Sequence, residues 1–247
     1  MRRAGAARPR PNRPHATIVT TRIRIPSDEL LKALRRTPAP SLREALESTL
    51  RRLQGDARNG RGLLAEVLGQ DGAFVEWEHY PPRDAVDRRS GFRFYYHAHE
   101  AARRAVDEHG HFHVFAARAA ARDGEPAYMH LFAISVDARG MPTRVFTTNR
   151  WVTGEHWQSA PSVLRALRRL DLSGARPRRV AAWVQDMARL FSPQIEAVIH
   201  ERDRRIAERA RRQPLQQLLE DRRTHIVSQC AVDLARQFEC LERAGVA

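Results

Sequence analysis

EHGHFHVF, the stretch Glu108–Phe115, places a histidine at every second position: His109, His111 and His113. A period of two is the repeat of a β-strand, in which alternate side chains point to the same face of a sheet. The aromatic and β-branched residues between the histidines also favour a strand. The stretch therefore predicts a strand with histidines on one face and apolar side chains on the other.

A second pair of histidines lies upstream in FRFYYHAH, where His97 and His99 have the same spacing. The residues between the two stretches can form the loop of an antiparallel hairpin. In that register His97 opposes His111 and His99 opposes His109, with Cβ atoms about 5 Å apart. All five histidines would then share one face of the sheet, whereas a slip of one residue would separate the two groups.

Further strand patterns surround this hairpin. AFVEWEHY alternates and ends at Pro81-Pro82, while YMHLFAISV and TRVFTTN follow the histidine strands and are joined by a turn at Asp137–Gly140. Short connections between successive strands favour a meander. The sequence thus predicts an α+β fold, with an antiparallel, meander-like β-sheet of four or five strands flanked by N-terminal and C-terminal helices.

Four segments are expected along the chain. They are a disordered basic tail (1–20), an N-terminal helical segment (21–72), an α+β core domain (73–205) and a C-terminal helical extension (206–247). In the last segment one helix is expected over about 214–243, with apolar residues along one side: Val227, Cys230, Leu234, Phe238 and Leu241. That side must be covered by the domain or by a second copy of the chain, so a homo-oligomer through this helix is one expectation.

The histidine face suits a divalent metal ion. Imidazole nitrogens from facing strands can converge on Zn²⁺ at about 2.0–2.1 Å and leave a position for water. Fe²⁺ or Mn²⁺ would fit if a carboxylate such as Glu108 or Glu100 supplied a ligand. The predicted ligands are His97, His99, His109, His111 and His113. Five exceed the need of one ion, so Glu108 and His113 are also candidates for acid–base roles in hydrolytic or oxidative chemistry of no specified substrate.

Two other interpretations stay open. The histidines, interleaved with aromatic residues, could form a metal-free pocket for a small molecule or an interaction module, or they could be purely structural. The segment TTNRWVTGEHW (147–157) could be a pocket rim, with Arg150 offered to an anion, or simply a packed loop anchored by Trp151. The residues predicted to line such a pocket are Tyr95, His130, Asn149, Arg150, Trp151 and Thr153.

The composition constrains the partners. The net charge is +14, but Lys32 is the only lysine and many arginines alternate with acids, as in HERDRRIAERARR. Such pairing occurs on solvated helix faces, so nucleic-acid binding is expected to be absent or weak and non-specific. No apolar run approaches the roughly 20 residues of a membrane helix, and the basic N-terminus lacks a signal-peptide core, so a cytoplasmic protein without membrane contact is expected.

Other common chemistries lack their motifs. The sequence has no Walker A loop, no HExxH helix and no G-x-S-x-G elbow, and neither cysteine adjoins a histidine.

The series WEHYPP, YYHAHE, EHGHFH, HLFAISVDARGMP, FTTNRWVTGE and LFSPQIEAVIHERD resembles an uncharacterised bacterial family, a domain of unknown function. The resemblance covers roughly residues 75–205. It implies that the strand region and the helix after it form one unit, and it implies no activity, substrate or cofactor.

Overall fold

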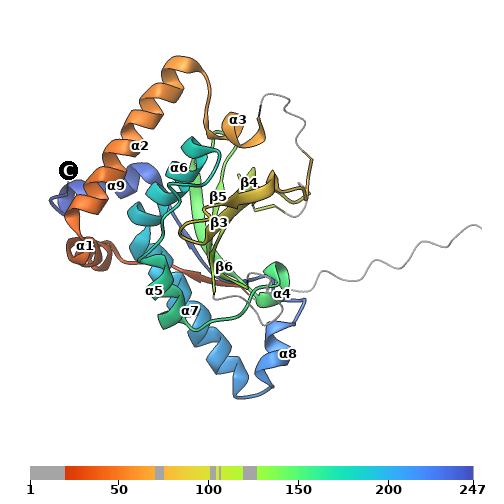
Figure 1. Cartoon of the computed structure of the whole chain (residues 1–247). Coiled ribbons are helices and arrows are strands. Elements are labelled where there is room, and N and C mark those ends of the chain that lie inside the picture. Colours follow the sequence, from red (N-terminus) through yellow and green to blue (C-terminus); the bar gives the residue numbers. More distant parts are fainter. Residues whose placement is uncertain (1–19, 70–74, 101–103, 106, 119–126, 247) are drawn as a thin grey trace, which may run out of the picture.

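The computed structural model describes residues 20–69, 75–100, 104–105, 107–118 and 127–246. Within them a seven-stranded sheet has the order β1-β7-β6-β5-β4-β3-β2 (Figure 1). The strands are β1 (Thr21–Ile23), β2 (Tyr80–Val86), β3 (Phe92–His97), β4 (Gly110–Ala117), β5 (Tyr128–Val136), β6 (Pro142–Thr148) and β7 (Ile226–Ala231). The expected tail lies outside the described residues except for its last position.

The helices come before and after the meander. They are α1 (Ser27–Arg36), α2 (Ala39–Asn59), α3 (Leu63–Leu68), α4 (Arg150–Thr153), α5 (Ala160–Leu167), α6 (Arg178–Leu190), α7 (Ser192–Ala210), α8 (Leu215–Leu219) and α9 (Leu234–Arg243). Figure 1 shows α2, α6 and α7 on one side of the sheet. No helix among the described residues has both the length and the apolar character needed to cross a membrane.

The antiparallel meander is confirmed for β2 to β6, each of which pairs with the next strand of the chain. The turn after β5 is also confirmed, because Gly140 has a φ of 78° and its N–H donates to the carbonyl of Asp137. The sheet nevertheless has more strands than expected, since β7 pairs antiparallel with β6 and β1 lies parallel to β7.

The prediction of a single helix over about 214–243 is wrong. The structure divides that region into α8, strand β7 and α9. The stretch IVSQCA of β7 completes the edge of β6, and this sheet pairing outweighs the helical spacing of its apolar residues. Cys230 and Cys240 therefore lie in different elements, both buried and both free. The apolar residues of α9 belong to the core of the chain itself, where Leu234, Cys240 and Leu241 are buried.

The strand expected at AFVEWEHY begins outside the described residues, and over residues 75–79 the structure shows no strand. Strand β2 begins at Tyr80, where that prediction ended, and it contains both Pro81 and Pro82. Proline cannot donate to a ladder, but β2 is an edge strand, and its pairing with β3 is irregular between Tyr80 and Ala85. The edge position of β2 thus accommodates the two prolines, which do not end the strand.

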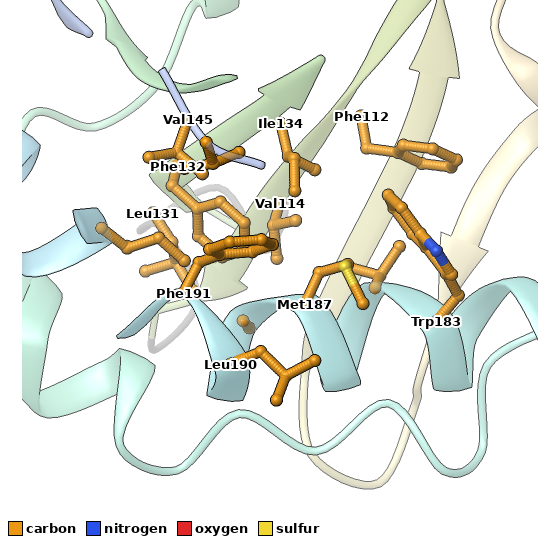
Figure 2. Packing of buried hydrophobic residues seen from close by; sticks show 14 of the residues in the cluster. Phe112, Val114, Leu131, Phe132, Ile134, Val145, Trp183, Met187, Leu190 and Phe191 are labelled. Carbon is orange, nitrogen blue, oxygen red and sulfur yellow. The ribbon is translucent and has the colours of Figure 1, made fainter. Parts of the chain in front are cut away.

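Two different faces result from the alternation along the strands. On the covered face, Trp183 and Met187 of α6 pack against Phe112 and Val114 of β4 (Figure 2). On the opposite face of the same strand lie His111 and His113. Burial of the aromatic and aliphatic side chains on the covered face fixes the register and thereby holds the histidines together on the other face.

Candidate metal centre

The register of the β3–β4 hairpin is the predicted one. His97 pairs with His111 and Tyr95 pairs with His113. Because paired residues of antiparallel strands point to the same face, these four rings form one continuous surface. The side chains of His111 and His113 are almost completely buried, whereas His97 is partly exposed.

Three of the predicted ligands, His97, His111 and His113, come together as a triad. One ring nitrogen from each lies within 4.8 Å of the others, so this group could hold a metal ion. The ring centroids are 4.5 Å apart for His97 and His111, 5.2 Å for His97 and His113, and 5.0 Å for His111 and His113. The Nε2 atoms of His97 and His111 are 2.7 Å apart, a hydrogen-bond distance.

Glu108 orients one ring of the triad. Its Oε1 lies 2.7 Å from Nδ1 of His111, and its Oε2 accepts hydrogen bonds from Ser135 and Arg144. Burial alone would raise the pKa of Glu108, but the hydrogen bond and charge of His111 and the charge of Arg144 hold that pKa at about 2. A carboxylate can only accept, so Nδ1 of His111 donates the proton of this bond, and in the neutral ring, the form that coordinates a metal, Nε2 carries the lone pair.

A second buried ring supports His113. Nδ1 of His113 lies 3.0 Å from Nε2 of His130, which is itself 1% exposed. Burial lowers the pKa of His113 well below its ordinary value, and it lowers the pKa of His97 to about 2 and that of His130 to about 3. These rings are therefore neutral at physiological pH, which is the form that coordinates a metal.

The other two predicted ligands do not join the triad. His99 follows the end of β3, and its ring stacks on Trp77 with centroids 4.5 Å apart. The same ring lies 5.0 Å from His97 and 5.1 Å from His111, so His99 borders the triad although its nitrogens are not among the three that converge. His109 precedes β4, and its Nδ1 is hydrogen-bonded to the hydroxyl of Tyr96, a residue of the helix-covered core. The alternation that would have placed His109 beside His111 does not extend past the start of the strand at Gly110.

The residues predicted to line a pocket lie in two separate places. Tyr95 and His130 lie on the histidine face. The others pack α4 against the chain around α8: Asn149 donates to the carbonyl of Leu218, Arg150 pairs with Glu220, and Trp151 donates to the carbonyl of Thr224. The Thr153 hydroxyl lies next to Glu155. These contacts are those of a packed loop, and a ligand-binding role for the segment stays a prediction.

Asn149 provides a test of this packing. Its side chain is fully buried, its Nδ2 donates to Leu218 over 2.8 Å, and its Oδ1 accepts from the N–H of Arg150 over 2.9 Å. Asn149→Ala leaves both partners unsatisfied and should lower the free energy of unfolding by about 1–3 kcal/mol, measured by urea denaturation. Arg150→Ala, which removes a partly exposed ion pair, should change it by less than about 1 kcal/mol. Equal effects of the two variants would contradict this account.

The sequence pattern did not indicate two residues around the histidine face, His79 beside His97 and Glu155 beside His130. His79, in WEHYPP, lies with its Nδ1 3.0 Å from Oδ1 of Asp84. Glu155, in GEHW, accepts a hydrogen bond of 2.6 Å from the backbone N–H of His130. Burial raises the pKa of Glu155 to about 7, although Arg202 opposes the shift. The only signal for His79 was its position beside the strand prolines, and Glu155 had no distinguishing spacing.

A cavity of about 140 Å³ lies elsewhere, where β1 and β7 approach α9. Cys230, Gln194 and Gln237 are among its lining residues, and no histidine is. It therefore does not bear on whether the histidine face binds a small molecule.

Comparison with known proteins identifies the family of this chain. The sequence pattern of a domain of unknown function, DUF6969, matches residues 43–232. The chain belongs to the DUF6969 family. The match covers β2 to β7 and all the residues of the triad. No curated protein and no solved structure matches this DUF6969 member.

Proposed function

We propose that this DUF6969 protein binds one divalent metal ion through His97, His111 and His113. The observation that carries the proposal is the convergence of three ring nitrogens within 4.8 Å on a sheet face, two of the rings being almost completely buried. Burying several imidazoles without a cation between them leaves polar rings that must satisfy one another, whereas a shared ion satisfies all three at once.

The hydrogen-bond partners of the Nδ1 atoms of His111 and His113 support the same assignment. Metal-binding histidines commonly donate their other N–H to a carboxylate, which fixes the tautomer and the ring orientation. Glu108 holds His111 in this way. His130 holds Nδ1 of His113 in a similar position. In both cases Nε2 is the nitrogen left for coordination.

Metal binding requires a small rearrangement. Two nitrogens bound to one tetrahedral Zn²⁺ at about 2.0–2.1 Å are roughly 3.3 Å apart. The Nε2 atoms of His97 and His111 lie 2.7 Å apart, so the two rings must separate by several tenths of an ångström. His97 is the partly exposed member of the triad and is the ring expected to move.

The ligand set favours Zn²⁺. Three neutral imidazoles suit zinc, whereas Fe²⁺ and Mn²⁺ sites more often include a carboxylate. Glu108, the nearest acid, is committed to His111, Ser135 and Arg144. Three protein ligands also leave a coordination position for water or a substrate, as in catalytic zinc sites. Hydrolytic chemistry is therefore the reaction class that the proposal favours, with no substrate specified.

Elemental analysis of untagged, dialysed protein tests the proposal. We expect close to one zinc per chain in the wild type. His97→Ala should weaken retention, and the double variant His97→Ala/His111→Ala should contain no bound metal. The exposed His200 of α7 serves as the control, and replacing it with Ala should leave the metal content unchanged.

Folding must be followed in the same samples, because His111 is buried. A double variant that keeps the wild-type circular dichroism spectrum but contains no metal supports the site. Wild-type protein that neither contains a divalent metal nor takes one up at neutral pH would refute the proposal, and retention of zinc by the folded double variant would refute the assigned ligands.

A further inference from the structure

A second carboxylate–histidine pair stands beside the triad. Nδ1 of His79 lies 3.0 Å from Oδ1 of Asp84, and the other carboxylate oxygen, Oδ2, lies 3.4 Å from Nη1 of Arg93. Since the carboxylate can only accept, Nδ1 of His79 donates the proton of this bond, and in the neutral ring Nε2 is then an acceptor. This is the arrangement that Glu108 imposes on His111, but His79 is not one of the three converging ligands.

The ring of His79 is fixed in place by packing. It stacks on Tyr95, with centroids 3.7 Å apart and planes 8° from parallel. It also meets the edge of His97, with centroids 5.7 Å apart and planes at 77°. Tyr95 in turn lies 5.2 Å from His113. His79 therefore stands next to one member of the triad, His97, and is separated from a second, His113, by the ring of Tyr95.

Its position is one step outside the triad. The separation of 5.7 Å between the rings of His79 and His97 exceeds the separations of 4.5–5.2 Å within the triad. The side chain of His79 is 40% exposed, whereas His111 and His113 are buried. His79 thus lies beside His97, the partly exposed member of the triad, at the more solvent-exposed edge of the centre.

An irregularity in the backbone of β2 brings Asp84 and His79 together. The pairing of β2 with β3 is interrupted between Tyr80 and Ala85, and irregularities of this kind re-aim side chains. Asp84 lies in the interrupted stretch with a φ of 41°. Such a value is uncommon for a residue other than glycine, although aspartate tolerates it better than most. The local conformation turns the carboxylate of Asp84 toward both His79 and Arg93.

We propose that the Asp84–His79 pair is a positioning device that accepts a hydrogen bond from whatever occupies the open coordination position of the metal ion. The inference rests on the proposed metal site. Because Nε2 of His79 is an acceptor, the pair favours bound molecules that carry a hydrogen atom to donate, such as water, a hydroxyl or an N–H group. Anions without hydrogen gain nothing from it. His79 thereby contributes selectivity rather than metal affinity.

The full chain loaded with Co²⁺ tests this, because the visible absorption of Co²⁺ reports the exchange of its ligands. Two probes are titrated: acetohydroxamate, which retains an N–H donor when bound, and azide, which has no hydrogen. In His79→Phe the affinity for acetohydroxamate should fall about tenfold, the size of one hydrogen bond, while the affinity for azide should not fall. His79→Gln, whose Oε1 can accept, should recover part of the loss.

Asp84→Asn should reverse the preference. Arg93 is a donor, so the amide oxygen of the new residue should face Arg93 and its NH₂ group should face His79. His79 would then accept at Nδ1 and carry its proton on Nε2. The affinity for azide should rise and that for acetohydroxamate should fall. A purely structural role for Asp84 would not move the two probes in opposite directions.

The outcomes separate the two proposals. Failure of the wild type to take up Co²⁺ removes the metal site and this inference together. Normal uptake with unchanged probe affinities in His79→Phe overturns the inference alone. Loss of Co²⁺ in His79→Phe would make His79 a ligand and would likewise overturn the acceptor role. His200→Phe is the control for an exposed histidine on α7, which covers the opposite face of the sheet, and it should change neither affinity.

Discussion

Glu108→Ala is expected to lower the free energy of unfolding by about 3–5 kcal/mol, because removing one partner leaves a buried charge without compensation. The Glu108 side chain is 4% exposed and interacts with His111, Ser135 and Arg144. Its removal takes the paired carboxylate away from the guanidinium of Arg144, which keeps the neutral partners Ser135 and Gln229. Chemical denaturation followed by tryptophan fluorescence measures the change.

Metal affinity should fall in the same variant. Without the carboxylate, Nδ1 of His111 loses the acceptor that fixes its tautomer, and loss of such a partner typically weakens metal binding about 10–100-fold. Glu108→Gln keeps one acceptor oxygen and should have a smaller effect on both quantities. Glu47→Ala, which removes an exposed pair with Arg51, should change stability by less than about 1 kcal/mol. Glu108→Ala with the midpoint and affinity of the wild type would show that the network is not needed.

The sequence was sufficient for the centre of the fold. Alternation along EHGHFHVF and FRFYYHAH predicted both strands, and the hairpin register that places His97 opposite His111 is the observed one. This success has a physical cause, since a period of two on a half-apolar strand allows one burial pattern and a slip would bury the wrong face.

Pairings between strands far apart in the chain could not be predicted from the alternation of residues. Strand β7 pairs with β6 and β1, which lie about 80 and 200 residues away in the chain, and its residues also fit a helical spacing. The same holds for His79 and Glu155, because each reaches the histidine face through a backbone turn or a loop contact rather than through strand periodicity. His109 shows a second limit of the sequence pattern. It keeps the spacing of His111 and His113, but it precedes the first residue of β4, so its side chain does not follow the alternation of the strand.

Gly110 is where the strand meets its loop, and Gly110→Ala should lower the free energy of unfolding by about 3 kcal/mol. A methyl group there would lie 2.6 Å from Cζ of Tyr96 and 2.7 Å from the carbonyl oxygen of His97. Neither group can move away at low energetic cost. Tyr96 is fully buried and hydrogen-bonded to His109, and the carbonyl belongs to the last residue of β3. The strain therefore falls on the backbone that carries a proposed metal ligand.

The two effects of Gly110→Ala should appear together, as a lower unfolding midpoint and as weaker metal retention through displacement of His97. Gly55→Ala is the matched control, because Gly55 lies inside helix α2 with nothing within 4 Å of the added methyl group. It should raise the free energy of unfolding by about 0.5–1 kcal/mol, since alanine loses less conformational freedom than glycine in a helix. If Gly110→Ala were as stable as the wild type, the close approach of β3 and β4 at Gly110 would be wrong. If it were destabilised yet bound metal normally, His97 would not depend on that approach.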